Sequence, residues 1–237
     1  MRLHREMMRT LATEIVAGVR EEGAMLPKEV DLAAQFDISR GVAREGIRAL
    51  EERGLLRVRH GRGATVAPRE AWDLFDPDVI TVLLEGPAAT QVLRDYLECR
   101  RILEVDAAGL AAERARPSDI ETLAARLEEM DAAVRSRSQD AEATFHRADV
   151  GFHEALLAAT GNRALGTLAR RIHEALLAAR YPLARPAYRK QRAMPEHRAI
   201  FDAVGRQDAE AARAAMRDHL ATVAGYLEEH AKRVARG

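Results

Sequence analysis

The stretch LPKEVDLAAQFDISRGVAREGIRALEERGLLRVRHGRGATVAP, residues 26–68, decides the fold of the first third of the chain. Apolar residues recur in it at helical spacing, which predicts a short helix over 26–36 and a longer one over 40–54. The tripeptide "DIS" between them predicts a tight turn. Gly54 follows the last helical residue, where a glycine commonly closes a helix in the left-handed conformation.

The residues before and after these two predicted helices also have recognisable patterns. Downstream, "LLRVR" (55–59) and "ATV" (64–66) flank the glycine-rich "HGRG" (60–63), which predicts a short β-hairpin. Upstream, residues 5–22 place apolar side chains on one helical face. Three helices followed by a hairpin is the order of a winged helix-turn-helix, in which the third helix enters the major groove of DNA.

Charge is concentrated locally in a chain whose formal net charge is zero. Across residues 38–66, seven arginines and three glutamates leave an excess of four positive charges. Arg40 and Arg44 lie one helical turn apart, and arginine forks suit guanine edges or phosphate oxygens. Ser39 is placed to cap the helix and to donate to a phosphate. The arginine run taken alone also fits a solvated helix face.

The spacing of the whole stretch resembles the DNA-binding domain of the GntR superfamily of bacterial transcription regulators over residues 8–67. The shared motifs are Leu-Pro-x-Glu, Asp-Leu-Ala, Ser-Arg, Arg-Glu and a Gly-Leu followed by a His-Gly-x-Gly wing. The resemblance implies binding of a double-stranded DNA operator. The positions that it implies contact DNA are Ser39, Arg40, Gly41, Val42, Arg44, His60 and Gly61.

Two features depart from that family pattern. Val30 stands where an arginine is usual, which removes one expected phosphate contact. Gly41 and Gly46 stand where larger residues are usual, and each glycine costs up to about 1 kcal/mol of helix stability. We therefore expect the third helix to be slightly frayed until it binds DNA.

The pattern changes after Pro68. Residues 68–87 read as an irregular connector, and from residue 88 to 237 only helical patterns follow, about six in all. Hydrophobic residues make up 47% of the chain and aromatic residues only 4%, which favours an Ala/Leu-packed helical protein. We predict a mainly α protein, with a winged helix-turn-helix domain at 1–67, a connector at 68–87 and an all-α bundle at 88–237.

Several classes of protein are excluded or disfavoured. The single cysteine, Cys99, rules out an internal disulfide framework and a cysteine-based zinc site. The charged N-terminal residues do not resemble a signal peptide, and no apolar run approaches the length of a membrane span. We expect a soluble, cytoplasmic protein without a membrane partner.

The stretch ADVGFHEALL, residues 148–157, places an acid and an imidazole on an apolar helical stripe. A buried carboxylate is costly unless something pairs with it. Asp149 and His153 lie four residues apart, and His197 and His219 also sit on apolar stripes of other predicted helices. Such a set can bind a first-row metal ion and leave a position for a ligand oxygen. From spacing alone, a hydrogen-bonded core residue is the favoured interpretation of each histidine.

A second resemblance favours the metal. Residues 88–235 resemble the helical effector domain of the FadR-type branch of GntR regulators, through "RRILE", "DVGFH", "TGN", "EHRAIFDAV" and "MRDHL". The resemblance implies that Asp149, His153, His197 and His219 bind a metal, most simply Zn²⁺, with Ni²⁺ or another first-row ion as alternatives. It further implies that Arg100 and Asn162 contact a small carboxylate effector. Trp72 and the residues after it resemble the connector of branch members that respond to sugar acids.

These observations lead to one main expectation and two alternatives. We expect a homodimeric transcription repressor, not an enzyme, that binds a palindromic operator and releases it when a sugar-acid or other carboxylate effector binds. A metal-dependent enzyme acting on a small acid is the first alternative, but no general base or nucleophile is evident beside the motif. A DNA-binding protein with a purely structural metal is the second.

Overall fold

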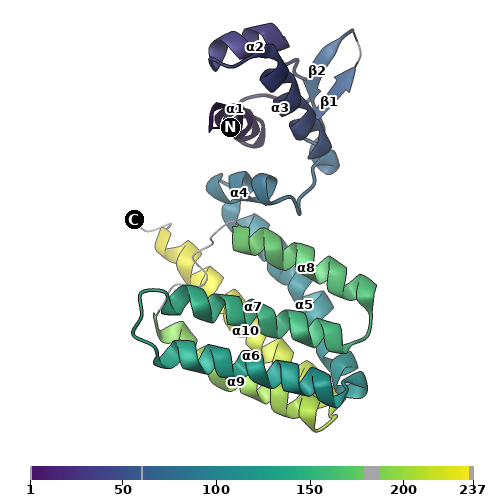
Figure 1. Ribbon diagram of the computed structural model, residues 1–237, viewed down its shortest axis with the longest axis vertical. Helices are drawn as coiled ribbons and strands as arrows, with labels where there is room; N and C mark the ends of the chain where they lie inside the picture. The colour runs from purple at the N-terminus through teal and green to yellow at the C-terminus, as the bar shows by residue number, and fades with distance from the viewer. Residues whose placement is uncertain (1, 60, 179–186, 235–237) are drawn as a thin grey trace. The chain divides into compact units, whose positions relative to one another are not determined.

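A computed structural model describes residues 2–59, 61–178 and 187–234 of the chain. Within these ranges the fold is mainly α, as predicted, with ten α-helices and one small hairpin (Figure 1). The chain divides into two compact units. The first contains the residues up to Val92 with a short piece at the end of α8, and the second contains the remainder from Leu93.

The first unit is a three-helix group with a hairpin, followed by one more helix. Its core is formed by buried side chains such as Met7, Leu11, Leu32, Ile47 and Leu50. Its elements in chain order are α1 (Arg2–Val16), α2 (Glu29–Gln35), α3 (Arg40–Glu52), β1 (Leu56–Arg59), β2 (Gly63–Val66), the 3-10 turn η1 (Arg69–Ala71) and α4 (Pro77–Glu85).

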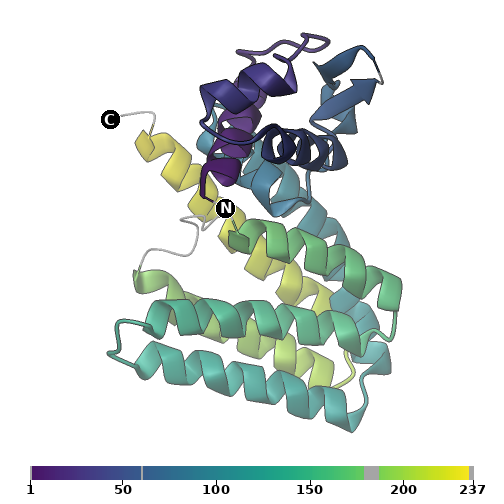
Figure 2. The same cartoon turned by 45° about the horizontal axis from the view of Figure 1, so that its top comes forward.

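The two-stranded hairpin is antiparallel and lies at one side of the three helices (Figure 2). Its register pairs Leu56 with Val66 and Arg59 with Gly63. Leu56 and Val66 are buried in the unit's core, which fixes the register because a slip by one residue would expose them. The other end of the hairpin, which carries Gly61, extends away from that core and is exposed.

Helix α3 starts and ends close to the predicted residues. The Ser39 hydroxyl accepts a hydrogen bond from the Val42 N–H at 3.3 Å, the N-cap that the sequence predicts. The helix is continuous through Gly41 and Gly46. Gly46 is buried against α1, and a β-carbon there would lie 2.1 Å from the terminal methyl of Met7. Close packing between α1 and α3 therefore accounts for this glycine.

Helix α1 is shorter than predicted. It ends at Val16 rather than at residue 22, because Gly18 and Gly23 both adopt a positive φ, at 74° and 77°. Residues between them form turns instead of a last helical turn. The apolar pattern alone did not reveal this break, whereas the two glycines mark it.

The segment predicted as an irregular connector contains helix α4. Asp76 caps it by accepting from the Asp78 and Val79 N–H groups, and Pro77 occupies the first helical turn. Val79, Val82 and Leu83 of α4 belong to the core of the first unit. The sequence Asp-Pro-Asp is the signal that identifies this helix, since it combines an N-cap with a proline at N1.

Gly54 supports a prediction about stability. Its φ is 73°, and a β-carbon there would lie 1.8 Å from the Ala71 carbonyl oxygen. Gly54→Ala is expected to destabilise the first unit by about 2–4 kcal/mol, from backbone strain and overpacking. Denaturant unfolding followed by the fluorescence of Trp72, the only tryptophan, measures this change. Gly41→Ala is the matched control, because a β-carbon at Gly41 would lie 3.8 Å from the Ser39 hydroxyl, an ordinary contact distance. Equal stability of the two variants would contradict the prediction.

The second unit is a bundle of six helices, in agreement with the expected number. Apolar residues of α6, α7, α9 and α10 form most of its core, and Figure 1 shows these helices side by side. The helices are α5 (Ala89–Arg114), α6 (Pro117–Arg135), α7 (Ala141–Ala159), α8 (Arg163–Ala178), α9 (Ala187–Gly205) and α10 (Ala209–Val234). None of the helices in the described ranges is long and apolar enough to cross a membrane.

Ser118 and Glu121 have the spacing of a capping box, but helix α6 begins before them. Pro117 is its first residue, so the cap falls on Arg116. The Asp119 carboxylate accepts from the Arg116 N–H at 2.9 Å and also from its guanidinium. The proline fixed this start, because a proline is best tolerated where no intrahelical N–H is needed.

Candidate metal centre and nucleic-acid interface

The side chains expected to meet DNA lie at the start of α3. Arg40, Gly41 and Arg44 are exposed, and Val42 is half-buried beside them. Ser39 is also exposed, so its hydroxyl can donate outward while it accepts the capping bond. These residues form a compact exposed patch at a helix N-terminus, which suits the approach of a DNA strand.

The hairpin adds glycines and arginines near its tip. Gly61 and Gly63 have φ values of 74° and 88°. Apart from their chain neighbours, no described residue has an atom within 4 Å of the place where either β-carbon would be. Arg57, Arg59 and Arg62 are exposed. His60, the other expected contact in the wing, lies outside the described residues. The tip is therefore open enough for a backbone to approach closely.

Arg53, one of the seven arginines in residues 38–66, forms ion pairs within the first unit. Arg53, at the end of α3, lies 3.2 Å from the Asp76 carboxylate and 2.7 Å from the Asp78 carboxylate, both at the start of α4. It also donates to the Ala49 carbonyl. These contacts tie the end of α3 to α4, so Arg53 does not belong to the exposed set that can contact DNA.

Three histidines meet inside the second unit. His153 of α7, His197 of α9 and His219 of α10 each expose 2% or less of their surface. One ring nitrogen from each lies within 4.8 Å of the others. The rings of His197 and His219 have centroids 4.4 Å apart, and those of His153 and His219 are 5.3 Å apart. We call these three residues the histidine centre.

Each of the three imidazoles has an oxygen acceptor beside its Nδ1 atom. The acceptors are the Ala193 carbonyl for His197 at 2.8 Å, the Glu196 carboxylate for His219 at 3.0 Å and the Glu104 carboxylate for His153 at 2.8 Å. The hydrogen bonds of His197 and His219 place the proton on Nδ1, whereas the Glu104 carboxylate lies at ion-pair distance from His153 Nδ1 without hydrogen-bond geometry. The Nε2 atom of each of these two rings then presents a lone pair, the arrangement found in metal-binding histidines.

Two of the three Nε2 atoms lack a hydrogen-bond partner among the described residues. Those of His153 and His197 are buried and make no hydrogen bond within the part of the chain that the structure describes. A buried polar atom without a partner costs about 1–3 kcal/mol. Three converging imidazole nitrogens can hold a first-row metal ion, which would satisfy all of them together. The residues present thus fit a metal.

Asp149 lies beside the histidine centre, one helical turn before His153. Its side chain is buried, and its Oδ1 atom is 3.0 Å from His197 Nε2. The structure therefore brings together all four residues for which the sequence indicated metal binding. An aspartate with three histidines leaves room for a ligand oxygen on a five- or six-coordinate ion.

Burial shifts the titration of this group of side chains. Desolvation lowers the pKa of His153 and lowers that of His219 well below the usual range, which favours the neutral form that binds metals. Burial alone would raise the pKa of the Glu104 carboxyl, but Arg100, His153 and His173 outweigh it and hold the pKa well below its usual range. Glu104 is thus a buried carboxylate anion.

Arg100, the expected effector contact, reaches this region from α5. Its Nε donates to Glu104 Oε1 at 2.6 Å, and its Nη2 donates to Glu104 Oε2 at 3.2 Å. Its side chain is 12% exposed. Burial disfavours the charge of Arg100, yet the neighbouring Glu104 raises its pKa, so it stays a cation near Asp149 and the histidine centre.

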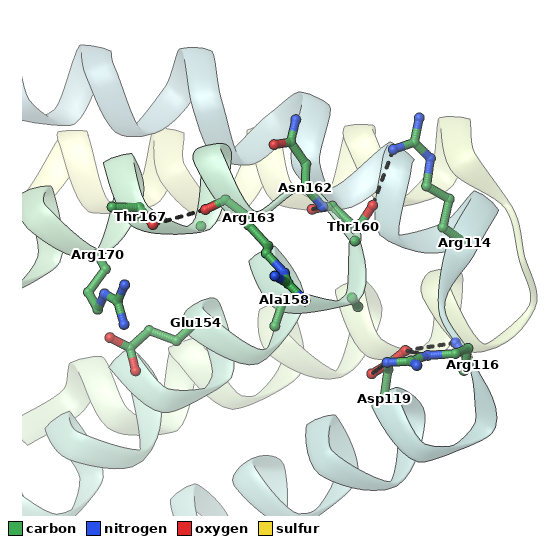
Figure 3. Close-up of a pocket in the computed structure, with 13 residues that line it drawn as sticks. Arg114, Arg116, Asp119, Glu154, Ala158, Thr160, Asn162, Arg163, Thr167 and Arg170 are labelled. Atoms are coloured by element: carbon green, nitrogen blue, oxygen red, sulfur yellow. Dashed lines mark hydrogen bonds and ion pairs between the residues drawn. The ribbon is translucent and has the colours of Figure 1, made fainter.

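Asn162, the other expected effector contact, lies elsewhere. It sits in the turn between α7 and α8 beside Thr160 (Figure 3), is exposed, and accepts from the Leu165 N–H through its side-chain oxygen at 3.2 Å. It lines a groove of about 800 Å³ together with Arg114, Arg163 and Arg170. The described residues that line this groove include none of the three histidines. The geometry gives Asn162 the role of a helix cap.

Sequence reasoning missed two members of this buried group. Glu104 is 1% exposed and contacts both Arg100 and His153. His173 is 3% exposed, and its Nε2 lies 2.9 Å from Glu104 Oε1. The available signal was the apolar residues around Glu104 in "RILEVDAAGLAA", among which an acid is unusual.

Comparison with known protein families gives two matches. Residues 3–66 match the model described as bacterial regulatory proteins, gntR family. Residues 95–222 match the model of the FCD domain. The first match covers α1, α2, α3 and the hairpin, and the second covers the histidine centre and Arg100.

Similar proteins match along most of the chain. The galactonate operon transcriptional repressor of Escherichia coli K12 is 36% identical over 222 residues, which cover 93% of this chain and 94% of that protein. The transcriptional repressor NanR of Escherichia coli K12 is 31% identical over 209 residues, which cover 85% of this chain and 75% of that protein.

A solved structure shows the same fold. Lar, which controls the expression of the Listeria monocytogenes agr system, has a TM-score of 0.68 at 17% identity. The match covers 95% of this chain and 96% of that one. At this identity the likeness concerns the fold alone.

Proposed function

The chain belongs to the GntR family of bacterial regulatory proteins and carries an FCD domain, and from this we propose that it is a repressor controlled by a sugar acid bound at a metal centre. Members of this family regulate transcription, which removes the basis for the enzyme alternative. The single observation that carries the proposal is the convergence of His153, His197 and His219 with Asp149 inside the second unit.

We assign DNA binding to the start of α3 and to the wing. Ser39, Arg40, Gly41, Val42 and Arg44 are accessible there. His60 and Gly61 complete the proposed set by the family pattern. Because readers of this type pair two half-sites about one helical turn of DNA or a multiple of it apart, a homodimer on a palindromic operator is the arrangement we propose.

We assign metal binding to Asp149, His153, His197 and His219, with Zn²⁺ as the ion that best suits three imidazoles and a carboxylate. A bound cation supplies positive charge that attracts a carboxylate group. Arg100 lies near Asp149 and carries a guanidinium whose geometry matches a carboxylate. An acid effector is therefore favoured over a neutral sugar by two separate positive groups.

The effector is proposed to be an aldonate such as galactonate. This rests on the relative that represses a galactonate operon and on the cationic centre described above. An effector that binds better to one arrangement of the second unit than to another shifts the population of dimers. Operator affinity then falls by the ratio of the two effector affinities, typically 5–150-fold.

Operator release tests the proposal. DNA fragments selected by the protein from a random library serve as the operator, and fluorescence anisotropy measures their binding to zinc-loaded protein. Galactonate is expected to lower the operator affinity about 5–150-fold. Galactose, which lacks the carboxylate, is the matched control and should leave the affinity unchanged. Chelated protein should lose the response to galactonate.

The outcomes separate the parts of the proposal. An equal response to galactose and galactonate would contradict recognition of a carboxylate. A full response after removal of the metal would contradict the role of the metal. A zinc-loaded protein that ignores galactonate and every other aldonate in a panel would show that the metal is structural, as the remaining alternative holds.

A further inference from the structure

Glu104 of α5 lies at the junction of the two proposed binding groups. Its two carboxylate oxygens contact three different side chains from three helices, namely Arg100 of α5, His153 of α7 and His173 of α8. All three contacts are between 2.6 and 2.9 Å at their shortest. At 1% exposure, the carboxylate has no competing solvent that would loosen this arrangement.

On one side, Glu104 sets the orientation of Arg100. The Nε and Nη2 atoms donate to the carboxylate, so the Nε–Nη2 edge of the guanidinium is occupied by Glu104. The edge formed by Nη1 and Nη2 remains, and Nη1 makes no hydrogen bond among the described residues. A second carboxylate can bind bidentately to that remaining edge. Glu104 therefore holds Arg100 in a pose that is ready for an acid ligand.

On the other side, Glu104 sets the tautomer of His153. Its Oε2 atom is 2.8 Å from Nδ1, an ion-pair distance without hydrogen-bond geometry. A carboxylate this close favours the imidazole proton on Nδ1, which leaves Nε2 for the metal. A carboxylate at this position also raises the basicity of the ligand nitrogen. Loss of the carboxylate would free the ring to adopt the other tautomer, which cannot bind the metal through Nε2.

His173 anchors the carboxylate from α8. Its Nε2 atom lies 2.9 Å from Oε1, the oxygen that also accepts from Arg100 Nε. Because Arg100 and Glu104 share a helix, they are one turn apart whatever the rest of the bundle does. The contacts to His153 and His173 instead fix the carboxylate relative to α7 and α8.

We propose that Glu104 is a positioning residue shared by the metal centre and the effector-binding arginine, and that it couples the two. This inference rests on the proposed function, since it concerns the same site. A ligand that binds at either side chain fixes Glu104 further, so the second ligand loses less conformational entropy when it binds. Metal and acid should therefore bind cooperatively in part through Glu104.

The test compares three variants of the full chain. Glu104→Gln keeps the shape but loses the charge, Glu104→Asp keeps the charge on a shorter side chain, and Glu113→Gln is the control, an exposed glutamate on the same helix. Zinc affinity is measured by competition with a chromophoric chelator, and galactonate binding to zinc-loaded protein by calorimetry. Melting temperature shows whether each variant folds.

We expect Glu104→Gln to lower both affinities, each by about 10–100-fold, as outer-shell substitutions do. Glu104→Asp should recover part of each loss, and Glu113→Gln should change neither. Loss of zinc affinity with unchanged galactonate binding would overturn the coupling. A lower melting temperature with both affinities intact would show that Glu104 only stabilises the fold, which also overturns it.

Two NMR signals of the metal-free protein test the positioning role without depending on the proposed function. In ¹⁵N NMR spectra, the wild type should show His153 protonated at Nδ1 and an Arg100 Nε–H shifted by a strong acceptor. Both signals should change in Glu104→Gln, with recovery in Glu104→Asp. A wild-type protein that binds no zinc but shows these signals would remove the proposed function and retain the positioning role. Signals that do not change in Glu104→Gln would remove the positioning role.

Discussion

Replacement of His219 by alanine is expected to lower zinc affinity by about 100–1000-fold. A complete zinc site contributes roughly 10–16 kcal/mol, so one of four ligands accounts for about 3–4 kcal/mol. His219 is 2% exposed and its Nδ1 faces the Glu196 carboxylate, which leaves Nε2 for the ion. Elemental analysis after dialysis and chelator competition measure the change. The effector should then no longer alter operator affinity.

Another histidine of the second unit provides the control for the His219→Ala variant. His146→Ala removes a half-buried histidine of α7 that is not part of the histidine centre. It should keep zinc at the wild-type level. Circular dichroism distinguishes loss of the ion from loss of the fold, because the remaining helices of the bundle should stay formed. Full zinc occupancy in a folded His219→Ala protein would remove this residue from the ligand set.

Replacement of Arg44 by alanine is expected to lower operator affinity strongly without affecting the metal site. Arg44 is exposed one helical turn after Arg40 on the recognition helix. A bidentate contact with guanine contributes about 1–3 kcal/mol, and a dimer carries two copies. Operator affinity should therefore fall about 30-fold or more. Anisotropy titration with selected operator DNA measures it, and zinc content should remain unchanged.

Two more variants separate base reading from simple charge. Arg20→Ala removes one positive charge from the same unit but at a residue paired with Glu14, so it should weaken operator binding little. Arg44→Lys keeps the charge but lacks the planar fork, so it should not restore specific binding. Restoration by lysine would show that Arg44 contacts phosphate. Unchanged affinity in Arg44→Ala would show that this helix does not read DNA there.

Local patterns predicted most of the fold because the helices follow local rules. Helical periodicity and the Ser39 cap predicted α3, and the glycine-rich tip predicted the hairpin. The error at α4 arose because its apolar residues were read without the Asp-Pro signal before them. At α6, Pro117 rather than the capping-box spacing of Ser118 determines where the helix starts.

The site was only partly predictable for a physical reason. Asp149 and His153 were found because both lie on one apolar stripe, where polar groups are conspicuous. Glu104 and His173 are 69 positions apart, and their partnership depends on how α5 and α8 pack. No spacing rule contains that information. The capping role of Asn162 likewise became visible only with its hydrogen bond to Leu165.

Anomalous diffraction at the zinc absorption edge, from crystals grown with zinc and without chelator, tests the central claim most directly. We predict one strong peak among the side chains of His153, His197, His219 and Asp149, at about 2.0–2.2 Å from the ligand atoms. Side chains that point apart with no peak between them would contradict the metal centre and leave only the DNA-binding unit of this account.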